Sequence, residues 1–368
     1  MKKIFTILLF VLTLGIFAQD PASSQFFFNQ LYMNPSFAGI NRDARFGLDY
    51  RRQWAGIPGK FETYDCWGDI YSNLFNGGLG FVISEDISGD GYLRTTNTGI
   101  IQSFEYTVPK IVRIRAGISV AGVIKRIDWN KLVFSDQIDP VLGVVYETNV
   151  ERQYGRTRAF ADFGTGFMFD FHMIKTKHAV ITNTAGYSVN HLTQPNESLS
   201  GAENQRLPRK HTFHLTTTIE MIGNGTHKSK WFFSPNIIYD RQGIGNSKGV
   251  FPFSNSAQFS AFNIGMFVMN QPAIGGLFFR KKRALGFKDN DAFIMFLGFK
   301  HDGPNKTVLK FGYSYDFTIS NLSSNSLGSH EISISVEFKN RTLRLRGKRG
   351  FFNSRTDCED FGQRSFLF

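Results

Sequence analysis

Cysteine and long apolar runs are what this chain most clearly lacks. Only Cys66 and Cys358 occur among 368 residues, which excludes a disulfide framework. We do not expect the two to pair, because Cys66 lies within a strand pattern and Cys358 in the tail. Beyond the first eighteen residues no apolar run is long enough for a membrane helix, and the mean hydropathy is −0.19. These absences exclude a helical membrane protein and a small disulfide-stapled domain.

The first eighteen residues have the pattern of an export signal. Lys2 and Lys3 precede an apolar stretch from Ile4 to Leu12, and the cleavage site is expected near Ala18. An uncleaved anchor is the alternative, but the stretch is short for a membrane span. No cysteine follows the expected cut, so the sequence does not predict a lipoprotein. We therefore expect a mature chain that is exported.

Aromatic residues and glycine are abundant, with 40 Phe and 36 Gly. In the segment 329–339, Ile332, Ile334 and Val336 alternate with polar residues, which is typical of a strand with one apolar and one wet face. The same pattern recurs along most of the chain. It predicts an all-β transmembrane outer-membrane β-barrel that presents apolar side chains to lipid and polar side chains to its lumen. We expect about fourteen antiparallel strands, at 44–52, 61–72, 77–86, 92–107, 111–127, 159–173, 177–190, 208–222, 229–240, 257–270, 273–283, 291–301, 306–319 and 329–339.

The lengths of the connections support this strand count. All the even-numbered connections are short, whereas the odd-numbered ones include the long segments 128–158, 191–207 and 241–256. Outer-membrane barrels have short periplasmic turns and longer extracellular loops. We therefore expect a multi-pass outer-membrane barrel that begins and ends on the periplasmic side, with the three long segments outside the cell.

Two segments lie outside the expected barrel at 44–339. Residues 19–43 form an N-terminal lead-in or plug, and residues 340–368 form a basic and aromatic tail in the periplasm. The net charge is +12, and six basic residues lie between Lys339 and Arg349. Nucleic acid is a poor partner for an exported protein, so this charge suits acidic protein or outer-membrane lipid such as lipopolysaccharide. No second folded domain is expected.

No residue pattern indicates an enzyme. We find no local arrangement of Ser, His and an acid that favours a hydrolase, and the glycine-rich stretches lie in strands without a following helix. Asp170 and His172 share a lumenal face, where an ordinary packed pair is expected. The segment from Asp136 to Asp139 resembles part of a calcium loop but lacks the full ligand spacing. We expect no catalytic residue, no cofactor and no metal.

Charges of both signs occur at positions expected to face the lumen. An ion-selective pore would be expected to carry a ring of one sign. Mixed signs instead suggest ion pairs across the lumen and a packed interior, which favours a scaffold over a conduit. A passive channel or small-solute transporter remains the alternative. The lumenal charges are Arg45, Asp49, Arg51, Lys310, Asp316, Glu331 and Glu337, and we expect a structural role above all for Arg45, Asp49, Arg51, Asp316 and Glu331.

Several segments, in order along the chain, resemble the PorP/SprF family of type IX secretion outer-membrane proteins of the Bacteroidota. The first is the stretch from Gln25 to Gly39, which is similar to the opening signature of the family. The resemblance departs from the family at the end, because the chain has Cys358-Glu359-Asp360 where a Cys-Pro element is usual. The other segments are Tyr50-Arg51-Arg52-Gln53-Trp54, Phe134-Ser135-Asp136-Gln137-Ile138-Asp139, Asp162-Phe163-Gly164-Thr165-Gly166, the stretch from Gly186 to Pro195, Gly312-Tyr313-Ser314-Tyr315-Asp316 and Gly328-Ser329-His330-Glu331-Ile332.

The resemblance implies a non-enzymatic role in protein secretion, in one of two forms. SprF-like members serve a particular cargo, typically a large adhesin with a type B C-terminal domain, in some cases for gliding motility. PorP-like members belong to the core machinery near the periplasmic ring. The SprF-like form is favoured here, because the sequence devotes its length to outward loops and a charged tail.

Two groups of residues are predicted to bind partners. Loops on a rigid barrel are where binding usually occurs, so the extracellular loops are expected to contact the cargo, although they could equally brace or close the barrel. The tail is expected to contact translocon or periplasmic ring proteins. The cargo-binding candidates are Asp136, Gln137, Asp139, His191, Leu192, Gln194 and Pro195. The periplasmic candidates are Arg341, Arg344, Arg346, Lys348, Arg349, Phe351 and Phe352.

Overall fold

The fold is known from a computed structural model of the chain. It describes residues 23–56, 59–89, 92–109, 111–149, 157–171, 173–199, 206–222, 231–243, 257–284, 290–319 and 326–339. The helical elements are α2 (Gln30–Met33), η1 (Pro35–Phe37), η2 (Trp129–Lys131), η3 (Ser135–Gln137) and η4 (Pro304–Lys306). The strands are β1 (Ala44–Gln53), β2 (Lys60–Ser72), β3 (Gly77–Gly89), β4 (Leu93–Val108), β5 (Val112–Arg126), β6 (Ile138–Asp139), β7 (Gly143–Val144), β8 (Thr157–Phe171), β9 (Ile174–Lys175), β10 (Ala179–Asn190), β11 (Lys210–Met221), β12 (Trp231–Gly243), β13 (Ala257–Asn270), β14 (Ala273–Ala284), β15 (Asn290–Asp302), β16 (Thr307–Thr318) and β17 (Ser329–Phe338).

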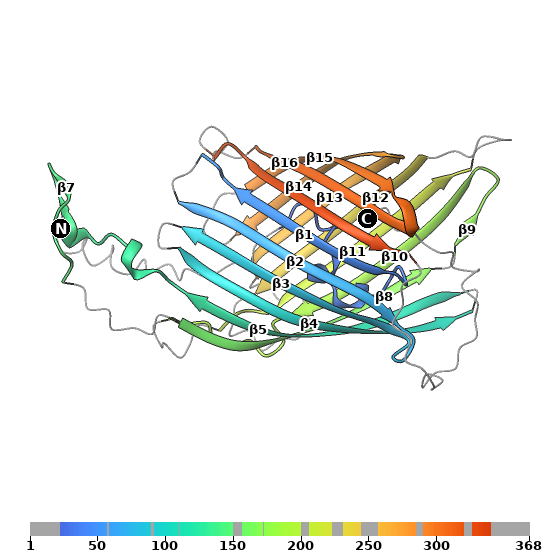
Figure 1. Cartoon of the computed structure of the whole chain (residues 1–368), viewed down its shortest axis with the longest axis horizontal. Helices are drawn as coiled ribbons and strands as arrows, with labels where there is room; N and C mark the ends of the chain where they lie inside the picture. Colours follow the sequence, from blue (N-terminus) through green and yellow to red (C-terminus); the bar gives the residue numbers. More distant parts are fainter. Residues whose placement is uncertain are drawn as a thin grey trace, which may run out of the picture.

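Fourteen long antiparallel strands close into a barrel (Figure 1). The first strand pairs with the last, Ala44 opposite Phe338, and β10 joins the two halves by pairing with both β8 and β11. Three short strands, β6, β7 and β9, lie outside the ring of fourteen and were not predicted. The predicted outer-membrane barrel of about fourteen strands is confirmed, and most predicted boundaries differ from the observed ones by no more than three residues.

The barrel has two unlike ends. At one end, here called the turn end, neighbouring strands are joined by short connections such as 73–76 and 271–272. At the other, the loop end, lie the connections between β5 and β8, between β10 and β11 and between β12 and β13. Figure 1 shows the β6–β7 segment extending far beyond the barrel at the loop end and β9 at the turn end. The alternation of short and long connections is therefore as the sequence predicted.

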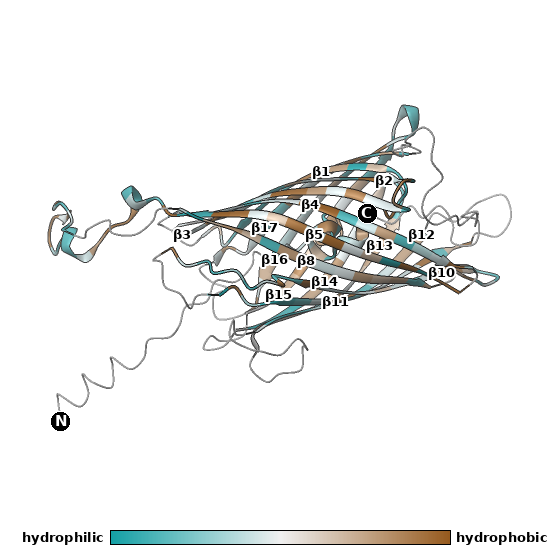
Figure 2. Ribbon diagram, turned by 90° about the horizontal axis from the view of Figure 1, so that it is seen from below, coloured by the Kyte–Doolittle hydropathy of each residue, from teal (hydrophilic) through white to brown (hydrophobic). Residues whose placement is uncertain are grey.

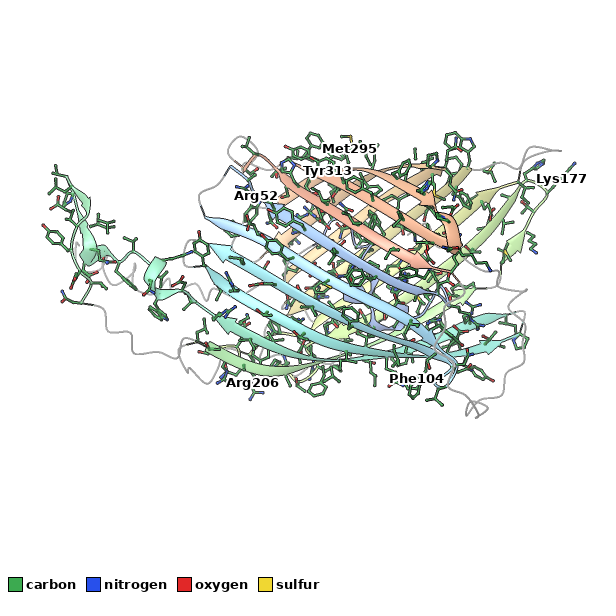
Figure 3. The ribbon with its side chains drawn as sticks, viewed as in Figure 1. Arg52, Phe104, Lys177, Arg206, Met295 and Tyr313 are labelled. Atoms are coloured by element: carbon green, nitrogen blue, oxygen red, sulfur yellow. The ribbon has the colours of Figure 1, made fainter. Side chains whose placement is uncertain are left out.

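Outward and inward side chains differ in chemistry, as period-two alternation requires. On β16, Leu309, Phe311 and Phe317 are exposed, whereas Lys310 and Asp316 are buried. Figure 2 shows apolar and polar positions alternating along the strands. Phe104, Met295 and Tyr313 lie on the outside of the barrel in Figure 3. Within the part of the chain that the structure describes, no helix is long and apolar enough to cross a membrane.

Residues 23–43 lie inside the barrel (Figure 1, dark blue). They form α2 and η1, which meet at Asn34. Asn34 is extended, with φ −153° and ψ 121°, because a residue before proline disfavours the helical region. Pro35 then starts η1, where its fixed φ suits the first helical position. We call this stretch the N-terminal segment. The expected signal peptide and the tail from residue 340 onward lie outside the described residues.

Candidate functional site

Aromatic packing fixes one side of the N-terminal segment to the barrel wall. Phe27 and Phe28 are buried in a cluster with inward residues of β13, β14 and β15. The ring of Phe27 lies 4.1 Å from that of Phe267 and 4.8 Å from that of Phe296, both edge-on. Edge-to-face aromatic pairs add about 0.5–1.5 kcal/mol to the free energy gained from area burial. The other cluster members are Met269, Ile274, Phe278 and Ile294.

A second apolar cluster holds the later part of the segment against β2, β3, β4 and β8. It joins Leu31, Phe37, Ala38 and Ile40 to wall residues that include Trp67, Val82, Ile101 and Met168. Trp67 faces the lumen and its Nε1 donates a hydrogen bond to Asp49 Oδ2 at 2.8 Å. By alternation Trp67 shares the inward face of β2 with Asp65 and Asp69, so the sequence pattern of this strand is ambiguous. The N-terminal segment resolves that ambiguity, because it gives the indole an apolar surface inside the barrel.

Glycines in the wall allow the backbone of the segment to approach closely. A Cβ at Gly117 would lie 2.3 Å from the backbone nitrogen of Ser36 and 2.4 Å from the carbonyl carbon of Pro35. A Cβ at Gly166 would lie 2.0 Å from Asn34 Oδ1. Real Cβ atoms do not approach other atoms so closely, so both positions require glycine while the segment is in place. The barrel wall is therefore shaped to this segment.

Buried ion pairs tie the beginning of the segment to the loop-end half of the barrel. Arg51 pairs with Asp316 and with Glu331, each at 2.8 Å, and Arg280 pairs with Asp316 at 2.7 Å. The hydroxyl of Ser24 donates to Asp316 Oδ2, and its backbone amide donates to Glu331 Oε2. Charge-assisted hydrogen bonds of this kind are the stronger ones in proteins. The network therefore connects the segment to β1, β14, β16 and β17.

Other ion pairs among the described residues join neighbouring strands. Arg45 on β1 pairs with Asp69 on β2 at 2.8 Å, and Lys310 on β16 pairs with Glu337 on β17 at 3.0 Å. Arg115 on β5 pairs with Glu105 on β4. We expected pairing across the lumen, but the ion pairs that the described part of the chain shows join nearby strands or join the segment to a strand. The reason is that the N-terminal segment occupies the centre, so opposite walls do not meet.

The loop that follows β10 is bound to the rim of the barrel. His191 Nδ1 lies 2.8 Å from Asp162 Oδ2 on β8, and the amide of Leu192 donates to the carbonyl of Phe163. The guanidinium of Arg209 in turn donates to the carbonyl of Leu192. Further along, the amide of Leu207 donates to the carbonyl of Pro195. The predicted cargo-binding residues His191, Leu192, Gln194 and Pro195 thus lie in a half-buried loop that braces the strand ends.

The loop between β5 and β8 has a different character. Its described part, 127–149, ends in the small β6–β7 hairpin, in which Ile138 pairs with Val144. Asp139 Oδ1 accepts hydrogen bonds from the amides of Leu142 and Val141, and these bonds lower the pKa of its carboxyl below the ordinary value. Asp136 accepts hydrogen bonds from the Thr148 hydroxyl and the Asn149 amide.

The predicted candidates Asp136, Gln137 and Asp139 therefore use their polar atoms to shape the hairpin. Gln137 Oε1 accepts from the amide of Phe134, and its carbonyl accepts from Val145 and Tyr146. What the hairpin exposes is apolar: the side chain of Val141 is 89% exposed and that of Leu142 is 73% exposed. Sequence reasoning did not single out these residues, although an apolar run in a connecting loop was a readable signal. We call Ile138, Val141, Leu142, Val144, Val145 and Tyr146 the hairpin patch.

The predicted periplasmic candidates, from Arg341 to Phe352, lie outside the described residues. The described residues contain no group of three or more His, Cys, Asp and Glu side chains that could hold a metal ion. Cys66 is a free thiol on β2.

The chain resembles solved outer-membrane barrels only distantly. It shares 11% identity with the CymD monoaromatic hydrocarbon channel, with 90% of this chain and 96% of that chain covered and a TM-score of 0.43. It shares 11% identity with the Ralstonia pickettii toluene transporter TbuX, covering 84% and 92%, with a TM-score of 0.42. Among curated protein sequences none matches the chain. The sequence profile of the type IX secretion system membrane protein PorP/SprF matches residues 16–336, and the chain therefore belongs to this family of outer-membrane secretion proteins.

Proposed function

We propose that this protein is a non-enzymatic outer-membrane partner of type IX secretion that holds a secreted cargo protein at the loop end of its barrel. Membership of the family supports a role in secretion. The proposed cargo is the C-terminal domain of a large surface protein, an adhesin in the SprF-like form of the role. We place the loop end outside the cell and the turn end in the periplasm, because outer-membrane barrels have longer extracellular loops and short periplasmic turns.

The hairpin patch is the observation that carries the proposal. Six apolar residues of a connecting loop are at least half exposed, and Figure 1 shows the hairpin well away from the barrel wall. Exposed apolar patches of this kind mark interaction sites, because burying them against a partner removes apolar area from water. Polar groups of Asp136 and Asp139 hold the hairpin in shape, so little ordering is needed when a partner binds.

Charged substitutions in the hairpin patch test this directly. Val141→Asp with Leu142→Asp should abolish cargo retention on the cell surface, while the barrel is made and inserted normally. Val133→Asp is the matched control, because Val133 is 55% exposed in the same loop but lies outside the hairpin. The readouts are surface proteomics of intact cells and co-purification from outer membranes. Undiminished cargo in the double variant would refute the proposed docking role.

A substitution in the loop at His191 distinguishes two roles of this loop, docking of the cargo and bracing of the barrel. Replacing His191-Leu192-Thr193 by Gly-Ser-Gly removes the contact with Asp162 and the side chain of Leu192. If this loop docks cargo, retention should disappear while barrel levels stay normal. A fall in the amount of folded barrel would instead assign the loop to bracing, which its contacts with β8 favour.

The tail is proposed to bind periplasmic components of the secretion machinery. It follows β17 at the turn end, and its basic and aromatic residues are suited to steer and anchor a protein contact. Deleting residues 349–368 should leave the barrel folded but remove secretion components from the purified complex. Recovery of every partner with the truncated chain would refute this contact, and would leave the PorP-like form of the role without support.

A passive channel is the competing function. The N-terminal segment lies in the lumen and is hydrogen-bonded to residues of β1, β5, β8, β16 and β17, which supports a scaffold. A steady conductance of the purified full-length protein in planar bilayers would favour the channel instead.

A further inference from the structure

A cavity of about 290 Å³ lies between the N-terminal segment and one side of the barrel wall. Leu31 and Tyr32 form its inner side, and inward residues of β3, β4, β5 and β8 form its outer side. It extends toward the loop end, since Ser88 and Leu93 border it on either side of the β3–β4 connection. No residue of this cavity belongs to the hairpin patch.

The deeper lining is apolar, although it is the inside of a barrel. Val82, Ile101 and Val123 are inward-facing and buried, as are Leu31 and Leu207 on the other sides. Elsewhere the described lumen wall carries charged residues such as Arg115 and Lys310. The apolar part of this lining is a favourable place for an apolar group, because contact there removes apolar area from water. The lining therefore suits the hydrocarbon part of a ligand.

Two hydrogen-bond acceptors also line the cavity, Asn97 on β4 beside Val123 and Asp162 on β8 beside Ala121. Asp162 is 91% buried; its Oδ2 contacts His191, and its Oδ1 has no hydrogen-bond partner. Asn97 Oδ1 is also buried and without a partner. A buried acceptor that is left unsatisfied is unfavourable, so a ligand donor that reaches it would be favoured.

The charges around the cavity select against an anion. Asp86 and Asp162 both line it, and the ammonium of Lys125, the one lysine among its lining residues, is already paired with Glu197. A carboxylate head would meet two like charges without a free cation, which is unfavourable. An ammonium or hydroxyl head would instead donate to acceptors that now lack donors.

We propose that this cavity binds a small amphiphile with an apolar body and a hydrogen-bond-donating head, either a primary ammonium or a hydroxyl. A cavity of about 150 Å³ accepts benzene, so a volume of about 290 Å³ suits a chain of roughly eight carbons or a substituted aromatic ring. The apolar body lies against Val82, Ile101 and Val123, and the head lies near Asp162 and Asn97. This ligand site is additional to the proposed cargo-holding role of the hairpin patch and shares no residue with that patch.

Calorimetric titration of the full protein in lipid nanodiscs tests the site with octylamine, octan-1-ol and octanoate. We expect saturable binding of the amine and the alcohol, and at least tenfold weaker binding of octanoate. Ala121→Phe should abolish binding, because Ala121 lines the cavity. Val120→Phe is the matched control, because Val120 is the adjacent residue and points outward at 48% exposure. Equal heats from both variants would show partition into lipid only and would overturn the proposal.

Head-group variants give a second, independent test. Asp162→Asn should weaken the binding of octylamine about tenfold and leave the binding of octan-1-ol nearly unchanged. Asn97→Asp should strengthen octylamine, a gain that a damaged fold cannot produce. If neither substitution changes the preference of amine over alcohol, the head does not lie near these residues and the assignment is wrong. Cargo retention, measured on the Asn97→Asp variant, should be unaffected, which separates this site from the hairpin patch.

Discussion

The two sides of the N-terminal segment differ in how completely they are packed. On the side of β13–β15, the rings of Phe27 and Phe28 are interlocked with Phe267 and Phe296. On the side of β3–β5, Leu31 and Tyr32 face a cavity of about 290 Å³. Both sides use apolar residues, but the cavity that Phe27 and Phe267 border is only about 30 Å³, so far less volume is open on the first side. The difference indicates that the aromatic side positions the segment, while the other side leaves the volume in which we propose that the amphiphile binds.

The largest effect is expected when the N-terminal segment can no longer pack inside the barrel, because the lumen is then open. Gly117→Leu places a side chain where the backbone of Pro35 and Ser36 now lies, so residues 23–43 should be displaced. Steady conductance in planar bilayers should then be larger than that of the parent protein. Gly122→Leu is the control on the same strand, because a Cβ there would meet nothing within 4 Å. A silent Gly117→Leu variant whose segment stays protected from protease would contradict the close packing.

Large-to-small changes on the two sides should differ in cost. Phe27→Ala should lower the free energy of unfolding by about 3–5 kcal/mol, because its ring contacts several others in a filled cluster. Leu31→Ala should cost about 2 kcal/mol, at the low end for leucine, because Leu31 already borders a cavity. Urea unfolding in lipid vesicles measures both. Equal costs would mean that the two sides are equally packed.

Adding one or two methyl groups should change the free energy of unfolding in opposite directions on the two sides of the segment. A Cβ at Gly276 would lie 2.5 Å from the ring of Phe267, so Gly276→Ala should destabilise by about 1–3 kcal/mol. Ala121→Val extends into the cavity and should stabilise by up to about 1 kcal/mol. The same unfolding assay applies. A destabilising Ala121→Val would indicate that the cavity wall cannot accept a larger side chain.

Much of the barrel could be predicted from local pattern. Alternation assigned Leu309, Phe311 and Phe317 outward and Lys310 and Asp316 inward, and the structure agrees. This works because successive strand residues point to opposite faces and each face meets a different solvent. The lengths of the connections then specified which strand ends share an end of the barrel.

The candidate site could be predicted much less well from the same local pattern. Val123 and Phe278 face the lumen although they are apolar, which the lipid-outside pattern does not anticipate. Alternation within their own strands places them inward, but what they meet there depends on the N-terminal segment: Phe278 packs in a cluster with Phe27, and Val123 lines the cavity beside Leu31. Likewise, Asp136 and Asp139 looked like binding residues, but their carboxylates are occupied in shaping the hairpin.

The sequence by itself determined the class of protein, the number of strands and the face on which most residues lie. These features depend on the two-residue period of a strand and on turn length, which are local. Only the tertiary structure decided that residues 23–43 lie within the lumen, which charges pair, and where volume remains unfilled. Those outcomes depend on contacts between residues up to about 300 positions apart, such as Ser24 with Glu331, whose energies exist only once the barrel has closed.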